Sequence, residues 1–185
     1  MDTRETLLAA ALTVLEENGE AEFSTRSVLA IANVTAPTLY HHFGNADGLL
    51  SAAIAEAFAQ FLRGKQAAIT SLDREEGLRQ GWANYVAFAA QRPRLYSAMM
   101  SRVLGGAQFP AAERAFAMLV AQVQAIDNEG RLAVSPTVAA DIVWASANSA
   151  ALLHVTARLR QVADPEPAVI DTIRENAMRT ILIAQ

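Results

Sequence analysis

The chain has 185 residues, of which 52% are hydrophobic and 18% charged, and its formal net charge is −4. This length and apolar content suit one or two small domains with a buried core and exclude a disordered chain. The absence of cysteine excludes disulfides, thiolate metal sites and thiol nucleophiles. Alanine is abundant while glycine and proline are few, so we predict an all-α fold.

The first predicted helix covers residues 2–18, where leucines and alanines recur at helical spacing until Gly19 ends it. A second helix, capped by Ser24 or Thr25, runs to about Ala32. Asn33 occupies the turn, because asparagine tolerates the left-handed conformation.

A third helix follows this turn. Thr35 caps it, Pro37 lies in its first turn, and it ends near Phe43-Gly44. Two short helices joined by a tight turn are typical of a helix-turn-helix, in which the second helix enters the DNA major groove.

The remainder of the chain predicts further helices separated by turn residues. Asn45 caps a long apolar helix, and a break at residues 71–73 precedes the next one. The expected helices then cover about 74–91, a shorter stretch from 93, 110–128, 136–160 and 167 to the C-terminus, with a loop at 104–110. We therefore predict a small N-terminal domain at 1–46 and a larger helical domain at 47–185.

The N-terminal residues closely resemble the DNA-binding domain of the TetR family of bacterial transcriptional regulators. The resemblance lies in Ala9-Ala10, Gly19, Phe23-Ser24-Thr25, Ile31-Ala32, Val34-Thr35, Thr38-Leu39-Tyr40, His42-Phe43, Asp47 and Leu49-Leu50. It implies a DNA operator as partner, and a helical body that binds a small effector and forms a homodimer.

The resemblance also implies which side chains contact DNA. These are Thr25, Arg26, Thr35, Ala36, Pro37, Thr38, Tyr40, His41 and His42. Thr25 would hold a phosphate at a helix N-terminus, Arg26 would reach a guanine, and Pro37 would touch a thymine methyl. The alternatives are that Tyr40 belongs to the core and that the two histidines are ordinary surface residues.

Two departures from the family concern affinity. Ala46 stands where members commonly carry a phosphate-binding lysine, and Asn33 replaces the usual turn glycine. Residues 1–50 hold two cations and seven acids, a net −5, which opposes binding to phosphates.

In the helical body, aromatic and methionine side chains predict either a packed core or a ligand cavity. The candidates are Trp82, Tyr85, Phe88, Met99, Met100, Phe116 and Trp144, joined by the polar Asn148. The family resemblance favours the cavity, and the sparse charge favours a largely apolar ligand.

The last two helices carry stripes that predict helix packing. One contains Ala140, Val143, Ala147, Ala150 and Ala151, and the other contains Val169, Ile170, Ile173, Ala177 and Ile181. Either both stripes bury against the body, or they form the two-fold dimer interface that the resemblance implies.

Together these features predict a ligand-released repressor that acts as a homodimer on a palindromic operator. The alternative is a helical small-molecule-binding protein that has lost appreciable DNA affinity. We expect no enzyme activity, cofactor or metal, because no phosphate-cradling glycine loop or metal-ligand spacing is present. The chain start lacks a basic leader, and no apolar run reaches the roughly 20 residues that span a bilayer, so we expect a cytoplasmic protein with no membrane partner.

Overall fold

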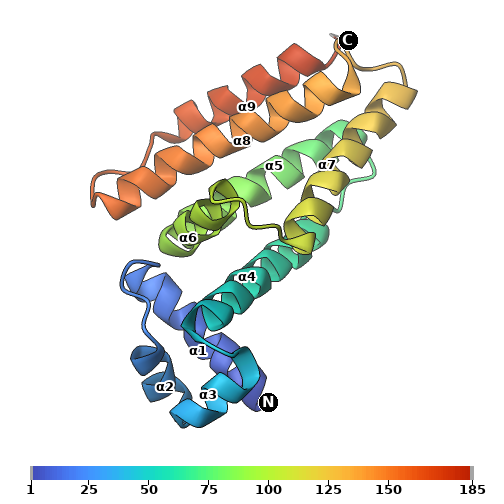
Figure 1. The fold of residues 1–185 in the computed structure, drawn as a ribbon. Coiled ribbons are helices and arrows are strands. Elements are labelled where there is room, and N and C mark those ends of the chain that lie inside the picture. Colours follow the sequence, from blue (N-terminus) through green and yellow to red (C-terminus); the bar gives the residue numbers. More distant parts are fainter. Residues whose placement is uncertain (1, 184–185) are drawn as a thin grey trace. The chain divides into compact units, whose positions relative to one another are not determined.

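Helices alone make up the regular structure of the chain in the computed structural model, which describes residues 2–183 (Figure 1). Their bounds are α1 Thr3–Asn18, α2 Thr25–Ala32, α3 Ala36–Phe43, α4 Ala46–Ala68, α5 Arg74–Gln91, α6 Pro93–Leu104, α7 Pro110–Asn128, α8 Pro136–Leu159 and α9 Pro167–Ile181. The predicted all-α fold is confirmed. The last helix ends earlier than predicted, because Leu182 turns to an extended conformation and forms an isolated bridge with Leu132; residues 184–185 lie outside the described part.

Local side-chain capping sets the starts of α2 and α4. Ser24 Oγ accepts a hydrogen bond from the backbone N–H of Ser27, and Asn45 Oδ1 accepts one from Gly48. Asn33 ends α2 in the left-handed conformation with φ 53°, as its side chain predicts. Thr35 stands at the N-cap of α3, but its hydroxyl bonds the Thr38 hydroxyl rather than the backbone.

The chain divides into two units. The first contains residues 1–60 and 92–111, and the second contains residues 61–91 and 112–185. In the first unit α1 packs on α2, α3 and α6, and α4 supplies the fully buried Leu49, Ala53 and Ile54. The predicted domain boundary after residue 46 stays a prediction.

The second unit has its core between α5, α7, α8 and α9. It is built from buried side chains that include Leu78 and Trp82, Val123 and Ile126, Val143, and Met178. α8 and α9 lie side by side, and α8 also packs on α5 (Figure 1). The alanine-rich face of α8 makes these approaches close.

The two predicted stripes differ in burial within one protomer. Ala140, Val143, Ala147, Ala150 and Ala151 of α8 are at most 4% exposed, because α5 and α9 pack on this helix. On α9, Ala177 and Ile181 are buried, Ile170 and Ile173 are partly exposed, and Val169 is exposed. The dimer interface through the last two helices stays a prediction. The other face of α8 is the apolar one that stays open, with Leu152 and Leu153 about half exposed.

α8 is also the only helix in the described residues that is long and apolar enough to cross a membrane by length and composition. Its alanine face packs inside the second unit, and 39% of its most apolar stretch is buried there. Such a helix is weak evidence for a membrane span.

Gly48 offers a stability test of the first unit. A Cβ at this position would lie 2.1 Å from the carbonyl oxygen of Phe43. We expect Gly48→Ala to lower the free energy of unfolding by about 1–3 kcal/mol, because the backbone between α3 and α4 must shift. The midpoint of urea unfolding measures this. Gly64→Ala is the matched control within α4, since its Cβ would meet only the Asn84 side chain at 3.9 Å; equal midpoints for the two variants would contradict the expectation.

Candidate functional site

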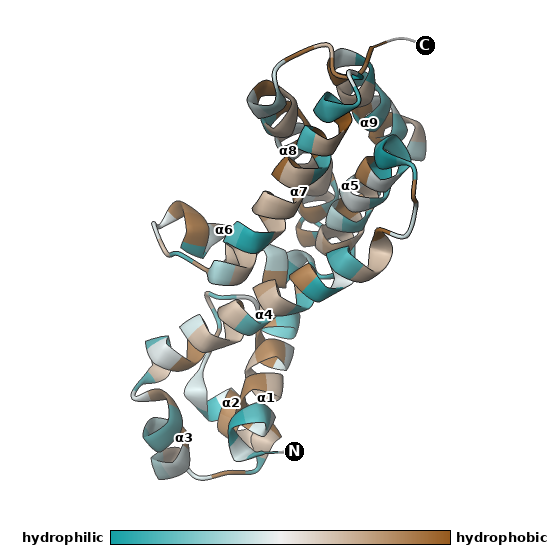
Figure 2. Cartoon of the chain, turned by 90° about the vertical axis from the view of Figure 1, so that its right-hand side faces the viewer, coloured by the Kyte–Doolittle hydropathy of each residue, from teal (hydrophilic) through white to brown (hydrophobic). Residues whose placement is uncertain are grey.

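The segment α2–turn–α3 presents one side of α3 away from the core. Leu39 is fully buried and anchors α3, while Pro37, Tyr40 and His41, spaced three and four apart, are exposed. Tyr40 is 48% exposed, so it is not a core residue. Figure 2 shows the hydrophilic colouring of this part of α3.

The remaining predicted DNA contacts lie around the same segment. Thr35 and Arg26 are exposed, and Thr25, Ala36, Thr38 and His42 are partly exposed. Thr25 and Arg26 are the first two residues of α2, after the Ser24 cap, where backbone N–H groups lack partners within the helix. The segment thus combines hydroxyls, one guanidinium, a phenol and two imidazoles on an accessible surface.

The two histidines pack on each other and on Phe43. Their ring centroids lie 5.4 Å apart, edge to face, and His42 lies 6.2 Å from the Phe43 ring. The Arg4 guanidinium lies over the ring of Phe43, 5.4 Å from its centroid. Within the described residues no three His, Cys, Asp or Glu side chains gather closely enough to hold a metal ion.

Three acidic residues of the first unit, Glu16, Glu20 and Asp47, pair with Arg92 and Arg102. Arg92 donates to Glu16, with Nε 2.8 Å from Oε1. Arg102 donates from Nε to Glu20 and from Nη1 to Asp47, each at 2.8 Å. The hydrogen bond to Asp47 raises the pKa of the Arg102 guanidinium above its ordinary value.

These pairs join elements far apart in sequence. Arg102 near the end of α6 connects the loop after α1 with the first turn of α4, across 82 and 55 residues. At the start of α1, the Glu5 carboxylate accepts from the Asp2 backbone N–H in a capping box. With α6 included, the first unit holds five arginines and eight acids, a net −3.

The predicted ligand residues of α5 line one side of an aromatic layer in the second unit. Phe61 of α4 contacts Tyr85 and Phe88, with ring centroids 5.5 Å and 5.3 Å apart. Tyr85 donates its hydroxyl to Asn148 Oδ1 at 2.7 Å. Trp82 is 3% exposed and donates to Ser146 Oγ at 2.9 Å. The helical spacing of Trp82, Tyr85 and Phe88 predicts a common face on α5. Phe61 was not among the predicted ligand residues, because it lies on α4 and no spacing along α5 includes it.

The other predicted ligand residues lie elsewhere. Phe116 and Trp144 meet edge to face at 6.4 Å, and they are 40% and 49% exposed. Met99 and Met100 belong to α6 in the first unit, where Met99 is 2% exposed. Their assignment as ligand contacts stays a prediction.

One residue was missed altogether. Lys65, near the end of α4, is 8% exposed and donates to the Ala115 carbonyl at 2.8 Å. No sequence pattern singles it out except that it is the only lysine in the chain.

An exposed polar α3, preceded by α2 and braced by α1, defines a helix-turn-helix DNA-binding protein. Comparison with known families gives the particular kind. Residues 7–53 match the family described as bacterial regulatory proteins, tetR family, and residues 78–175 match the tetracyclin repressor-like C-terminal domain. The second match alone spans more than half of the chain, so this protein belongs to the TetR family of transcriptional regulators.

Solved structures support the same fold. A TetR-family transcriptional regulator from Pectobacterium atrosepticum is 29% identical, with TM-score 0.76 over 98% of this chain and 95% of that one. A TetR-family transcription regulator from Marinobacter aquaeolei VT8 is 18% identical, with TM-score 0.74 over 98% and 96%. A protein of unknown function from Rhodococcus sp. RHA1 is 20% identical, with TM-score 0.80 over 99% and 97%. The comparison with curated proteins gives no match.

The Arg102 pairs lend themselves to mutation. We expect Arg102→Gln to lower the free energy of unfolding by about 1 kcal/mol, because two partly exposed ion pairs are lost. Urea unfolding at low salt measures the loss, and it should shrink as salt rises. Arg94→Gln removes the same charge from an exposed position of the same helix. An equal effect of both variants would mean that net charge, not the pairing, matters.

Proposed function

We propose that this protein is a cytoplasmic, homodimeric repressor that binds a palindromic operator and is released by a small, largely apolar effector. The observation that carries this proposal is the exposed α3 surface beside the N-terminus of α2, in a chain of the TetR family. The pairing of Glu16, Glu20 and Asp47 with Arg92 and Arg102 weakens the objection from acidity.

On the operator, each side chain has a distinct role. The N-terminus of α2 and the Thr25 hydroxyl hold a phosphate, and Arg26 reaches guanine O6 and N7. At the start of α3, Thr35, Ala36, Pro37 and Thr38 enter the major groove. Tyr40, His41 and His42 contact the DNA backbone or base edges farther along the helix. The scarcity of cations means that hydroxyls and helix N-termini carry most phosphate contacts.

The effector binds against the aromatic layer of Phe61, Tyr85 and Phe88 in the second unit. α4 runs as one helix from Ala46 to Ala68, so it contributes residues to both units. A displacement of α4 by the effector changes the placement of α3 on its half-site. A coupling of about 1–3 kcal/mol lowers operator affinity roughly 5- to 150-fold.

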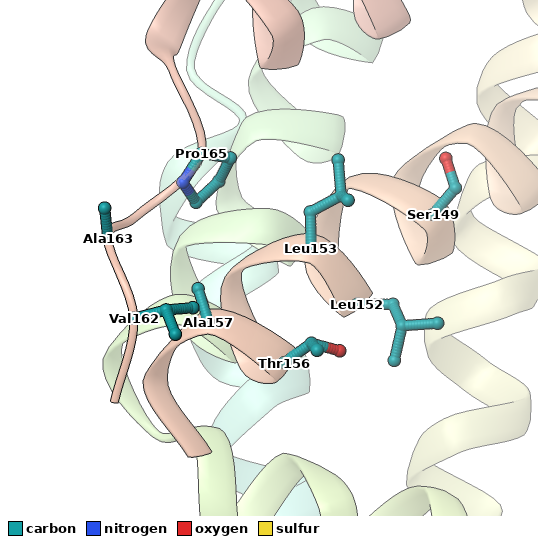
Figure 3. Close-up of a pocket in the computed structure, with 8 residues that line it drawn as sticks. All are labelled: Ser149, Leu152, Leu153, Thr156, Ala157, Val162, Ala163 and Pro165. Atoms are coloured by element: carbon teal, nitrogen blue, oxygen red, sulfur yellow. The ribbon is translucent and has the colours of Figure 1, made fainter. Parts of the chain in front are cut away.

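A second copy of the chain covers the open apolar face of α8. Ser149, Leu152, Leu153 and Thr156 of this face, with Val162 and Pro165 of the following loop, line a groove of about 550 Å³ (Figure 3). A solvent-exposed apolar face of this kind marks an association surface. A two-fold dimer also gives two α3 helices for the two halves of a palindrome.

Mobility shift with DNA from upstream of the protein's own gene tests the DNA-binding role. We expect a shift at about 50 mM salt, where phosphate contacts are strong. Arg26→Ala and Tyr40→Ala should each abolish it, because each removes a contact from the exposed surface. Absence of any shift by the wild-type protein would instead favour a helical binding protein without DNA affinity.

Ala46→Lys tests the same DNA-binding role by a gain of affinity instead of a loss. Ala46 is exposed at the start of α4, where family members commonly carry a phosphate-binding lysine. The variant should bind more tightly, with a salt dependence steeper by about 0.9 per added phosphate contact. Ala83→Lys adds an equal charge on an exposed position of α5 in the second unit and should leave the salt slope unchanged.

Light scattering tests the dimer. The wild-type protein should be a dimer, and Leu152→Asp should shift it toward monomer, because a carboxylate would be buried in an apolar interface. Leu104→Asp places the same charge on an 87% exposed leucine of the first unit and should leave the dimer intact. A wild-type monomer, or a Leu152→Asp dimer of unchanged stability, would refute the α8 interface.

A further inference from the structure

Lys65 is chemically unusual in this chain. The sequence holds fourteen arginines and this single lysine. It is also the only charged side chain among the described residues that is buried. Cations elsewhere are arginines, and the one ammonium lies inside the second unit.

The buried ammonium lacks a counter-ion. Its Nζ donates to the Ala115 carbonyl at 2.8 Å, and none of the described carboxylates forms an ion pair with it. An ammonium has three N–H donors, so this single bond leaves capacity unused. Burial lowers the pKa of Lys65 from 10.5 to about 8, so carrying the charge costs free energy at neutral pH.

Two buried acceptors occur in the same layer between α4, α5 and α7. Asn84 Oδ1 and Gln122 Oε1 are buried and have no hydrogen-bond partner. The Asn84 amide lies against Gly64, the residue before Lys65, and Gln122 lies against Gly77 and Gly81 of α5. Buried polar atoms are nearly always paired, so each of these two oxygens lacks a hydrogen-bond donor.

The surroundings of this polar group are apolar. Phe61 lies one helical turn before Lys65 on α4 and contacts Tyr85 and Phe88 of α5. Asn84 directly precedes Tyr85. A bound molecule would therefore meet aromatic rings with its body and the Lys65 ammonium with its head.

We propose that Lys65 binds the carboxylate of an otherwise apolar effector. A carboxylate accepts from the unused N–H bonds of Lys65 and supplies the counter-ion that the protein lacks. The orphaned oxygens of Asn84 and Gln122 accept hydrogen bonds, as a carboxylate does, so these amides meet such a ligand with their NH₂ groups only after rotation about the last torsion. This inference rests on the proposed effector-released function and specifies the chemical class of the effector.

Three probes with the same eight-carbon chain test the head group: octanoate, octanol and octylamine. Calorimetry should show octanoate binding roughly 10- to 100-fold more tightly than octanol, as expected for a charge-assisted hydrogen bond, with octylamine weakest. In Lys65→Met this preference should disappear. Arg114→Met, an exposed cation beside Ala115, should retain it.

A measurement on the wild-type protein covers the case in which Lys65→Met fails to fold. Protein labelled with ¹³C-lysine gives one Cε resonance, because the chain has one lysine. Octanoate should move its titration midpoint upward from about 8, and octanol should leave it unchanged.

Equal affinities for octanoate and octanol, no octanoate binding, or an unmoved lysine titration would overturn the proposal. The mobility shift of the same preparation without any probe reports on DNA binding separately. A protein that shifts DNA but ignores octanoate would keep the proposed regulatory function and lose only the carboxylate site.

Discussion

The guanidinium of Arg102 offsets part of the negative charge around the helix-turn-helix. A DNA-binding unit with more acidic than basic residues repels the phosphates of DNA, and acidic residues paired with arginines repel them less. Arg102 lies on α6, outside the helix-turn-helix, yet it bonds Glu20 and Asp47 on either side of that motif in the sequence. Together with Arg92 and Glu16, it makes α6 part of the unit that presents α3. The net charge of residues 1–50 alone therefore overstates the acidity of the DNA-reading surface.

The parts of the fold that sequence predicted are those set by neighbours along the chain. Ser24, Asn33 and Asn45 each act within three residues, so their side-chain chemistry alone places the ends of α2 and the start of α4. The spacing of Trp82, Tyr85 and Phe88 likewise fixes a common face. One detail of the capping differed, because Thr35 occupies the N-cap of α3 with its hydroxyl on Thr38 instead of the backbone.

What sequence did not predict depends on contacts across many residues. Arg102 and Glu20 are 82 residues apart, and Lys65 and Ala115 are 50 apart. The spacing of apolar and polar residues along the chain does not predict pairs of this kind. The alanine stripe of α8 shows a related limit, because small residues permit close approach without saying to which helix. Packing within the protomer decided that question, and it left the leucine-bearing face of α8 open.

The burial of Lys65 is the opposite case from the burial of these alanines. Close packing of the α8 alanines stabilises the fold. The buried Lys65 ammonium instead loses its hydration and recovers only one hydrogen bond, to a carbonyl. A methionine would fill a similar volume without that cost. Arginine would retain its charge more firmly than lysine and needs more donors satisfied. A lone buried lysine without a counter-ion is thus poorly explained by stability of the unliganded fold, and a ligand that brings its own negative charge explains it directly.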